Sequence, residues 1–327
     1  MTVQIIVGDC RSSLADMASE SVNCCVTSPP YFGLRDYGHD GQMGLEETPD
    51  EFVAGMVGVF REVQRVLRDD GTLWLNIGDS YASQPSWGRG GGSTLEGRKQ
   101  GLEGGRSTDR TKLPGLKQKD LIGIPWMLAF ALRADGWYLR QEIIWHKPNP
   151  MPESVTDRCT KAHESLFLLT KSPRYYFDAQ AISEPLADAN AQRTTDNYNT
   201  KDRYGAANGG NSGLDGLAAR MRAGDVSTRN KRSVWTVATQ PFSGAHFATF
   251  PPALIEPCIL AGTAPGDTVL DPFGGAGTTG LVADRLQRHA TLLELNPEYA
   301  ALARSRIDTD RGGGLLDAME TAQARSI

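Results

Sequence analysis

The chain has 327 residues, 39% of them hydrophobic and 22% charged, and a formal net charge of −5 at pH 7. This length suffices for one large domain with a substantial core. Apolar runs fall short of the ~18 residues that a membrane helix needs. Residues 1–9 lack the basic start and apolar core of a signal peptide. We therefore expect a soluble, cytoplasmic protein that does not act in a membrane.

Charge is distributed unevenly along the chain. Residues 1–81 carry 5 Lys or Arg against 13 Asp or Glu, whereas residues 82–120 and 193–232 each carry 8 against 4. Two basic segments in an acidic body are typical of a globular enzyme with one edge that faces a nucleic acid. Solvated loops would have the same composition, so charge alone leaves both interpretations open.

The N-terminal part predicts two strands, a helix and a third strand. Residues 3–7 and 21–27 are apolar runs of strand length, and each ends at a turn. Thr48 and Glu51 form a capping box, which predicts that a helix begins there. Residues 72–77 form the next predicted strand.

The middle of the chain contains two segments that are poor in core residues. Residues 82–120 hold 9 glycines in 39 positions and predict a flexible insertion. A helix over 121–134 and strands over 137–145 and 163–170 are expected next. Residues 187–230 are again polar, with many Gly, Asn and Arg.

The last part alternates helices with strands. The expected elements are a helix over 252–261, a strand over 268–270, a helix over 278–288, a strand over 290–293, a helix over 297–307 and a loosely ordered tail after Asp308. Because strands and helices alternate throughout, we predict an α/β fold with a doubly wound, mostly parallel sheet.

The five cysteines show no metal-ligand spacing, so no metal site is predicted. Cys24 and Cys25 lie in the apolar run 22–26 and are expected in the core.

A glycine-rich turn indicates a nucleoside site. Asp271-Pro-Phe-Gly-Gly-Ala-Gly-Thr-Thr-Gly280 follows a predicted strand and opens a helix, where glycines permit a sharp turn and close approach of a ligand. Glu294 ends the next strand, where a carboxylate can accept hydrogen bonds from ribose hydroxyls. Gly275-x-Gly277-x-x-Gly280 also satisfies the dinucleotide fingerprint, which makes NAD an alternative. Asp271 argues against NAD, because its carboxylate would repel a pyrophosphate but suits the cationic amino group of S-adenosylmethionine.

The sequence Ser28-Pro29-Pro30-Tyr31 follows the second predicted strand. Prolines have no N–H to donate, so the carbonyls here stay free. A serine hydroxyl and a proline carbonyl can accept both hydrogens of an exocyclic amine, and Tyr31 offers a ring on which a flipped base can stack. The amine would then attack a sulfonium methyl group in line, without a covalent enzyme intermediate. These four residues are the predicted catalytic residues.

Together these motifs resemble those of the β group of DNA methyltransferases that act on exocyclic amines. The acidic motif, the Ser-Pro-Pro-Tyr motif, the Trp-x-Lys-Pro segment, the His-x-x-x-Phe-Pro element and the Asp-Pro-Phe-x-Gly-x-Gly turn lie at 8–9, 28–31, 145–148, 246–251 and 271–277. The resemblance covers residues 9–307. It implies a circularly permuted fold of the S-adenosylmethionine-dependent methyltransferase type, with the catalytic motif before the cofactor motif.

The resemblance also assigns residues and partners. The implied cofactor is S-adenosylmethionine, bound by Asp9, Phe250, Asp271, Pro272, Phe273, Gly275, Gly277, Thr278, Glu294 and Asn296. Double-stranded DNA is the implied substrate, and Arg229, Lys231 and Arg232 are candidates for contacts with phosphates or guanine edges. A homodimer and a cognate restriction endonuclease are further partners that the family suggests.

The predicted organisation is one methyltransferase domain with two insertions. Its catalytic part occupies 1–81 and 121–186, the flexible insertion 82–120, the target-recognition region 187–235, the cofactor-binding part 236–308 and the tail 309–327.

Ser28 favours the N4 amine of cytosine, because serine usually accompanies that substrate in this family and Asp or Asn usually accompanies the N6 amine of adenine. Adenine N6 remains the alternative. Cys258 lies in an apolar helix before the glycine turn, so we expect a core residue and not the nucleophile of C5-cytosine methylation. An RNA or protein-amide methyltransferase and a catalytically silent DNA-binding protein are the remaining interpretations. The intact Asp271 and Glu294 argue against a silent protein.

Overall fold

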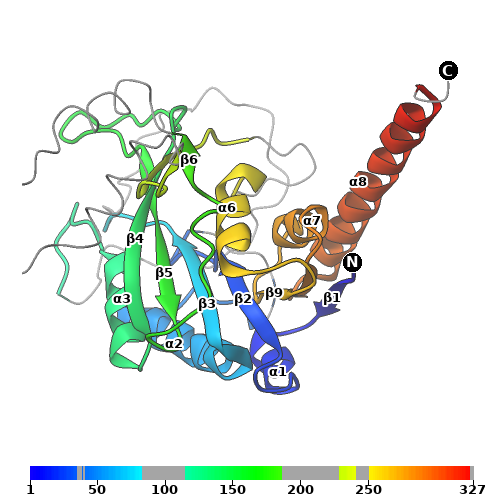
Figure 1. Ribbon diagram of the computed structural model, residues 1–327. Coiled ribbons are helices and arrows are strands. Elements are labelled where there is room, and N and C mark those ends of the chain that lie inside the picture. The colour runs from blue at the N-terminus through cyan, green and yellow to red at the C-terminus, as the bar shows by residue number, and fades with distance from the viewer. Residues whose placement is uncertain (35–38, 40, 83–114, 186–227, 241–249, 325–327) are drawn as a thin grey trace, which may run out of the picture. The chain divides into compact units, whose positions relative to one another are not determined.

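The computed structural model describes residues 1–34, 39, 41–82, 115–185, 228–240 and 250–324. The chain forms two compact units, Met1–Phe177 with Ser233–Ile327 and, separately, Asp178–Arg232. The first unit is a sheet with helices on both faces (Figure 1). Its strands are β1 (Val3–Val7), β2 (Val22–Thr27), β3 (Leu67–Ile77), β4 (Tyr138–His146), β5 (His163–Thr170), β8 (Val234–Thr236), β9 (Thr268–Asp271) and β10 (His289–Glu294). Its helices are α1 (Cys10–Ala15), α2 (Pro49–Val66), α3 (Ile124–Ala134), α6 (Pro252–Gly262), α7 (Thr278–Arg285) and α8 (Pro297–Ala324).

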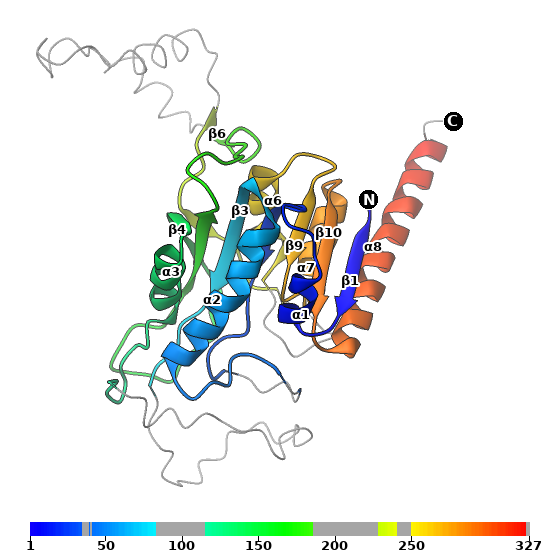
Figure 2. The same cartoon turned by 90° about the horizontal axis from the view of Figure 1, so that it is seen from below.

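The strands of this sheet lie in the order β1-β10-β9-β2-β3-β5-β4-β8. Neighbours are parallel from β1 to β3, β5 is antiparallel to β3 and β4, and β8 is parallel to β4. The predicted α/β fold with a mostly parallel, doubly wound sheet is therefore confirmed. Strands β9 and β10 lie between β1 and β2, although they come late in the chain (Figure 2). The circular permutation inferred from the motif order stays a prediction.

The direction of winding changes between β2 and β9. From β2 the chain crosses through α2 to β3, and from β9 it crosses through α7 to β10 on the other side. Ligands of open α/β sheets bind at such a switch point, at the carboxyl ends of the strands, because the two crossovers diverge there and leave a crevice. The Ser-Pro-Pro-Tyr motif follows β2 and the glycine turn follows β9, so the fold brings both predicted motifs to this crevice.

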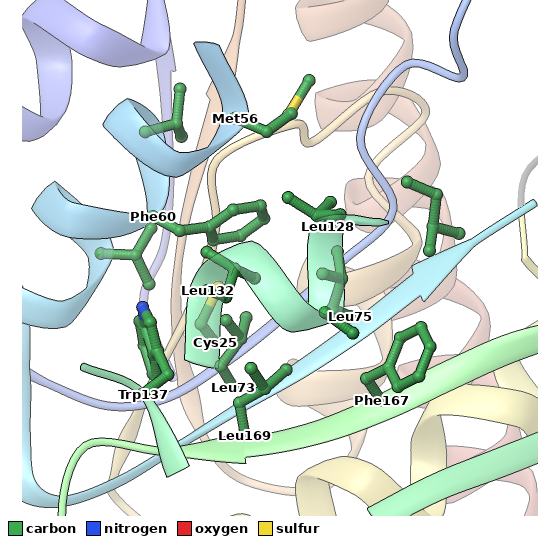
Figure 3. Close-up of a cluster of buried hydrophobic side chains, with 14 of the residues drawn as sticks. Cys25, Met56, Phe60, Leu73, Leu75, Leu128, Leu132, Trp137, Phe167 and Leu169 are labelled. Carbon is green, nitrogen blue, oxygen red and sulfur yellow. The ribbon is translucent and has the colours of Figure 1, made fainter. Parts of the chain in front are cut away.

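Helices α1, α2 and α3 cover one face of the sheet, and α6, α7 and α8 cover the other (Figures 1 and 2). Between the first face and its helices lies a cluster of buried apolar side chains, to which α2 contributes Met56 and Phe60 and α3 contributes Leu128 (Figure 3). Burying each such side chain contributes roughly 1.5–3 kcal/mol. Cys24 and Cys25 are buried in β2, as predicted.

Helix α2 begins as the sequence predicts. The Thr48 hydroxyl accepts a hydrogen bond from the Glu51 N–H at 3.2 Å, and the Glu51 carboxylate accepts one from the Thr48 N–H at 3.1 Å. A cap of this kind stabilises a helix by about 1 kcal/mol. The capped helix joins β2 to β3 and so helps to fix the tips of both strands.

Strand β3 begins earlier than predicted, at Leu67 and not at residue 72. The pairing with β2 continues across a bulge, from Val22 opposite Leu67 to Cys24 opposite Thr72. A bulge keeps an irregular segment in the sheet by leaving extra residues unpaired, which the sequence pattern of a turn does not reveal. The short helix α1 was also not predicted.

Helix α8 continues to Ala324, so the expected loose tail after Asp308 is wrong. Two ion pairs fasten α8 to α7 just beyond that point, Arg285 with Asp310 and Arg311 with Asp284. Such contacts between helices are not visible in the periodicity of one segment.

The second unit is described at residues 178–185 and 228–232. There β6 (Glu184–Pro185) pairs antiparallel with β7 (Thr228–Arg229). The rest of the predicted recognition region up to 227, and residues 83–114 of the predicted insertion, lie outside the described residues. In the part of the chain that is described, no helix is both long and apolar enough to span a bilayer.

Candidate active site

A pocket lies at the switch point, at the carboxyl ends of β1, β2, β9 and β10. All four predicted catalytic residues, 28–31, line it. Nine of the ten predicted cofactor residues also line it, namely Asp9, Phe250, Asp271, Pro272, Phe273, Gly275, Thr278, Glu294 and Asn296. The structure thus brings together in one pocket two motifs that lie more than 200 residues apart in the chain.

Gly277 is the exception among the predicted cofactor residues. It has φ +75°, and a Cβ at this position would lie 2.7 Å from the Cβ of Ala303 on α8. Glycine is therefore required by the backbone conformation and by packing against α8. Gly275, with φ +50°, lines the pocket, and a Cβ there would approach nothing closer than the Phe273 carbonyl oxygen at 3.9 Å. Within this turn, Gly275 is therefore the glycine that allows a ligand to approach the backbone closely.

Asp271 joins the two motifs. Its carboxylate accepts hydrogen bonds from the Thr27 hydroxyl at 2.6 Å, from the Thr279 hydroxyl at 2.6 Å and from the Phe273 N–H at 3.0 Å. Burial raises the pKa of Asp271 to about 6, although these hydrogen bonds act in the opposite direction. The side chain ties the tips of β2 and β9 together. With three of about four acceptor positions used, one is left for a ligand.

Glu294 is held at the tip of β10 by two backbone groups. One carboxylate oxygen accepts a hydrogen bond from the Gly275 N–H at 2.7 Å, and the other accepts one from the Asn296 N–H at 2.8 Å. Burial raises the pKa of Glu294. Each oxygen keeps a second acceptor position, as the predicted binding of two ribose hydroxyls requires.

The charge of the pocket suits a cationic ligand. Its described lining includes the carboxylates of Asp9, Asp271 and Glu294 and neither Lys nor Arg. The Asp9 carboxylate is paired with Arg11, which lowers the pKa of Asp9. The carboxylates of Asp271 and Glu294 would attract the sulfonium and ammonium groups of S-adenosylmethionine and repel a pyrophosphate. The residues present fit the predicted cofactor and do not fit NAD.

The Ser-Pro-Pro-Tyr motif leaves the tip of β2 directly after Thr27. The Ser28 hydroxyl donates to the Tyr31 hydroxyl at 3.5 Å. The Tyr31 ring packs against the backbone of Gly78, which follows β3, so closely that a Cβ on Gly78 would lie 2.5 Å from the Tyr31 Cε2. Gly78 therefore sets the position of the ring, although it was not predicted as a site residue.

A carboxylate outside the motif completes this part of the site. The Tyr31 hydroxyl donates to Glu164 of β5 at 2.7 Å, and Glu164 forms an ion pair with Lys147, which follows β4. Asn76 of β3 also donates to Glu164, at 3.2 Å. Lys147 belongs to the Trp-x-Lys-Pro segment, but Glu164 and Asn76 were not predicted. The sequence signal that could have identified them is a polar residue within an otherwise apolar strand, at the edge of the sheet where β2 ends.

Asp79 fastens neighbouring elements at this edge. Its carboxylate accepts hydrogen bonds from the N–H groups of Gly123 and Ile124, at 3.0 and 3.1 Å, and so caps α3, which has no cap of its own. The Asp79 carbonyl accepts one from Lys161, at 3.3 Å. These hydrogen bonds tie the segment after β3, which contains Gly78, to α3 and to Lys161.

Neither covalent nor metal chemistry is indicated by the described residues. Cys10 lines the pocket, but burial raises the pKa of its thiol to about 12, so the thiol stays neutral. Cys258 is buried in α6, as predicted for a core residue. No group of three metal-ligating side chains occurs in the described part of the chain.

The three predicted DNA-contacting residues gather around one carboxylate in the second unit. The nitrogen atoms of Arg229, Lys231 and Arg232 lie 3.4, 4.0 and 3.0 Å from the carboxylate of Glu184. Three cations with one anion leave the cluster with a net positive charge. His246 and the three residues after it, which belong to the predicted His-x-x-x-Phe-Pro element, lie outside the described residues.

Comparison with known proteins supports the same assignment. A family model described as DNA methylase, for N6 and N4 enzymes, matches residues 22–305. The type II methyltransferase M.SmaI of Serratia marcescens is 46% identical over 305 residues, which are 93% of this chain and 90% of the relative. M.XycI of Xanthomonas campestris pv. cyanopsidis is 50% identical over 301 residues, 92% of this chain and 86% of the relative.

The fold is shared with solved structures. PvuII DNA methyltransferase, which is cytosine-N4-specific, aligns with a TM-score of 0.60 at 18% identity and covers 95% of this chain and 91% of its own. M1.HpyAVI aligns with a TM-score of 0.53 at 17% identity, over 94% and 98% of the two chains. With the family model matching most of the sequence, the chain belongs to the N6/N4 DNA methylases, whose methyl donor is S-adenosylmethionine.

Proposed function

We propose that the protein is a site-specific modification methyltransferase that methylates the N4 amine of a cytosine flipped out of double-stranded DNA. The observation that carries the choice of cytosine is Ser28, which occupies the first motif position and lines the same pocket as Asp271 and Glu294. The adenine-N6 enzymes that the resemblance describes usually have Asp or Asn at that position. A flipped base is required because the amine of a stacked base cannot reach a pocket within the protein.

The catalytic effect of the motif is one of placement. The Ser28 hydroxyl and a carbonyl of the proline pair accept the two amine hydrogens, so the nitrogen lone pair is directed toward the cofactor wall. Bound S-adenosylmethionine supplies an electrophilic methyl group. The Thr27–Asp271 hydrogen bond fixes the spacing between the base and cofactor walls. Holding two reactants in this way is worth roughly 7–11 kcal/mol of barrier in favourable cases.

Sequence similarity supports the site-specific part of the proposal. M.SmaI and M.XycI are type II methyltransferases, and nearly half of the aligned residues are identical over nine tenths of this chain. We assign contacts with DNA to Arg229, Lys231 and Arg232. A cognate restriction endonuclease and a homodimer belong to the proposal as partners.

The test is nucleoside mass spectrometry, with modification-aware sequencing, of plasmid DNA from cells that produce the protein. We expect N4-methylcytosine within one short sequence. Ser28→Ala should remove the modification while S-adenosylmethionine binding, measured by calorimetry, stays within a fewfold of the wild type.

N6-methyladenine in place of N4-methylcytosine would overturn the choice of base and leave the fold and motif roles intact. Unmodified DNA from cells with folded, cofactor-binding protein would overturn the proposed function. Loss of cofactor binding in Ser28→Ala would contradict the separate roles of the two motifs.

A further inference from the structure

A series of hydrogen bonds leads from Ser28 to the carboxylate of Glu164, which lies outside the catalytic motif. Ser28 donates to Tyr31 at 3.5 Å, and Tyr31 donates to Glu164 at 2.7 Å. The other oxygen of Glu164 is paired with Lys147. The side chains of Glu164 and Lys147 are only 14% and 18% exposed, so water screens the pair weakly.

Glu164 fixes the direction of both hydrogen bonds. An ionised carboxylate only accepts, so the Tyr31 hydroxyl must donate to it. The Tyr31 oxygen is then the acceptor toward which the single Ser28 hydrogen points, across 3.5 Å. Ser28 therefore keeps lone pairs for an incoming N–H group, which is the role that an amine substrate demands.

Asn76 and Trp145 support this arrangement. The Asn76 amide donates to Glu164 and to the Ser165 carbonyl, both at 3.2 Å. Its oxygen is 3.3 Å from the Tyr31 hydroxyl, farther than Glu164, so the Tyr31 hydrogen is directed at the carboxylate. The Lys147 ammonium lies 4.3 Å from the centre of the Trp145 ring, which holds it beside Glu164.

We propose that Glu164 orients Ser28 as an acceptor and takes up the proton that methylation releases; this rests on the proposed function. As the amine nitrogen bonds to the methyl carbon, the carbon–sulfur bond breaks and its electron pair stays on sulfur. The nitrogen, now cationic, loses one proton to Ser28, while the Ser28 proton moves to Tyr31 and the Tyr31 proton to Glu164. Glu164 ends as a neutral carboxylic acid and later returns the proton to solvent.

Glu164 is a positioning residue in this scheme, because it acts on the amine only through Tyr31 and Ser28. Lys147 forms an ion pair with the Glu164 carboxylate. A glutamine at 164 has nearly the same shape but cannot take up the proton. Its amide can also donate to Tyr31, which would reverse both hydrogen bonds and turn the Ser28 hydrogen toward the substrate amine.

The experiment compares Glu164→Gln with Glu142→Gln. Glu142 is a matched control, because its carboxylate, on the neighbouring strand β4, accepts a hydrogen bond from Ser165 at 2.9 Å and none from Tyr31. Single-turnover methylation of a duplex with the target site is measured at neutral pH with enzyme in excess. Binding of S-adenosylmethionine and of DNA is measured at equilibrium.

We expect the single-turnover rate of Glu164→Gln to fall by about 100-fold or more, while both dissociation constants stay within about threefold, a split that general damage to the fold would not produce. Glu142→Gln should behave as the wild type.

A Glu164→Gln rate within about threefold of the wild type would overturn the inference. If Glu164→Gln does not fold, Tyr31→Phe is the deciding variant, because it keeps the ring and breaks the series of hydrogen bonds from Ser28 to Glu164. An undiminished methylation rate in Tyr31→Phe would also refute the inference. A wild-type protein that methylates no DNA would instead refute the proposed function.

Discussion

The carboxylates that line the pocket differ in their surroundings. Arg11 lowers the pKa of Asp9, whereas burial raises the pKa of Asp271 to about 6 and also raises that of Glu294. Buried carboxylates without a cation of their own are costly when ionised, and a cationic ligand removes that cost. If S-adenosylmethionine binds beside Asp271, as we propose, its binding is coupled to the ionisation of Asp271.

This coupling predicts a pH dependence of cofactor binding. If only the ionised form of Asp271 attracts the ligand, the dissociation constant for S-adenosylmethionine should rise about tenfold from pH 7.5 to pH 5, because about one tenth of the carboxyls stay ionised. Asp271→Asn should bind weakly at both pH values, with a smaller change. Isothermal titration calorimetry at the two pH values measures both.

Protonation of Asp271 does not itself destabilise the folded protein over this range. A pKa raised in the folded state means that the folded protein binds more protons than the unfolded chain between about pH 4 and 6. The contribution of Asp271 to stability therefore increases as the pH falls through this range. An unchanged dissociation constant at pH 5 would contradict the proposed attraction.

Gly78 predicts a loss of activity without loss of the cofactor. In Gly78→Ala the new Cβ would meet the Tyr31 ring, so the ring must move. A displacement of about 1 Å at a reacting centre can cost on the order of 100-fold in rate. We expect a fall of this size in single-turnover methylation, with S-adenosylmethionine binding preserved.

Gly58→Ala is the matched control for that substitution. Gly58 lies on the exposed side of α2, and a Cβ there would meet nothing within 4 Å. Alanine should stabilise this helix by roughly 0.5–1 kcal/mol and leave the rate unchanged. Equal activities of the two variants would show that the Tyr31 ring tolerates displacement.

At the scale of elements, local signals predicted most of the sheet but not its irregular parts. The strands at 3–7 and 163–170 have the predicted bounds, because each is a short apolar run of strand length that ends at a turn. The early start of β3 and the continuation of α8 depend on pairing across a bulge and on ion pairs between helices. Contacts of these kinds join segments that a local pattern treats separately.

The same division between local sequence signals and contacts of distant segments holds for the candidate site. Residues 28–31 and the glycine turn carry compact motifs, and the structure places both at the pocket. Glu164, Asn76 and Gly78 stand alone in the sequence and gain their roles only because β3 and β5 pair beside β2. Gly277 shows the converse, since a motif glycine serves packing against α8.

The two glycines of the turn predict different losses of stability. Both have positive φ, so alanine costs roughly 1–2 kcal/mol at either position. Gly277→Ala adds a clash with Ala303, and overpacking of this kind costs roughly 1–3 kcal/mol more. Urea denaturation should therefore show a lower free energy of unfolding for Gly277→Ala than for Gly275→Ala. Equal values would mean that α8 can move aside.

At the scale of the whole molecule, the protein has a negative net charge, whereas its proposed substrate, DNA, is a polyanion. The cations that contact DNA must therefore be concentrated in one region. The second unit offers such a concentration around Glu184. Each phosphate contact contributes about 0.9 to the slope of log K against log salt concentration. Binding that depends on this cluster must therefore depend strongly on salt.

Two substitutions in this cluster predict changes of opposite sign. Arg232→Ala should weaken duplex binding and reduce the slope by about 0.9, whereas Glu184→Gln removes an anion and should tighten binding. Fluorescence anisotropy from 50 to 200 mM salt, about the usual range, measures both. Arg61→Ala is the control, because it removes a cation that does not belong to the cluster. Arg61 is paired with Asp135 at the C-terminal end of α3, opposite to the end that Asp79 caps. Identical slopes for all variants would show that the cluster does not contact DNA.

The position of β9 and β10 between β1 and β2 has a consequence for synthesis on the ribosome. Val3 pairs with Ala290, so β1 has no neighbour in the sheet until β10 has emerged. At roughly 5–20 residues per second, that delay is on the order of 15–60 s. During this time β1 and one edge of β2 lack their partners in the sheet, and unpaired strand edges are prone to pair with other chains. Because β9 and β10 also carry Asp271 and Glu294, a chain interrupted before them lacks both carboxylates to which we assign the methyl donor, and we expect it not to modify DNA.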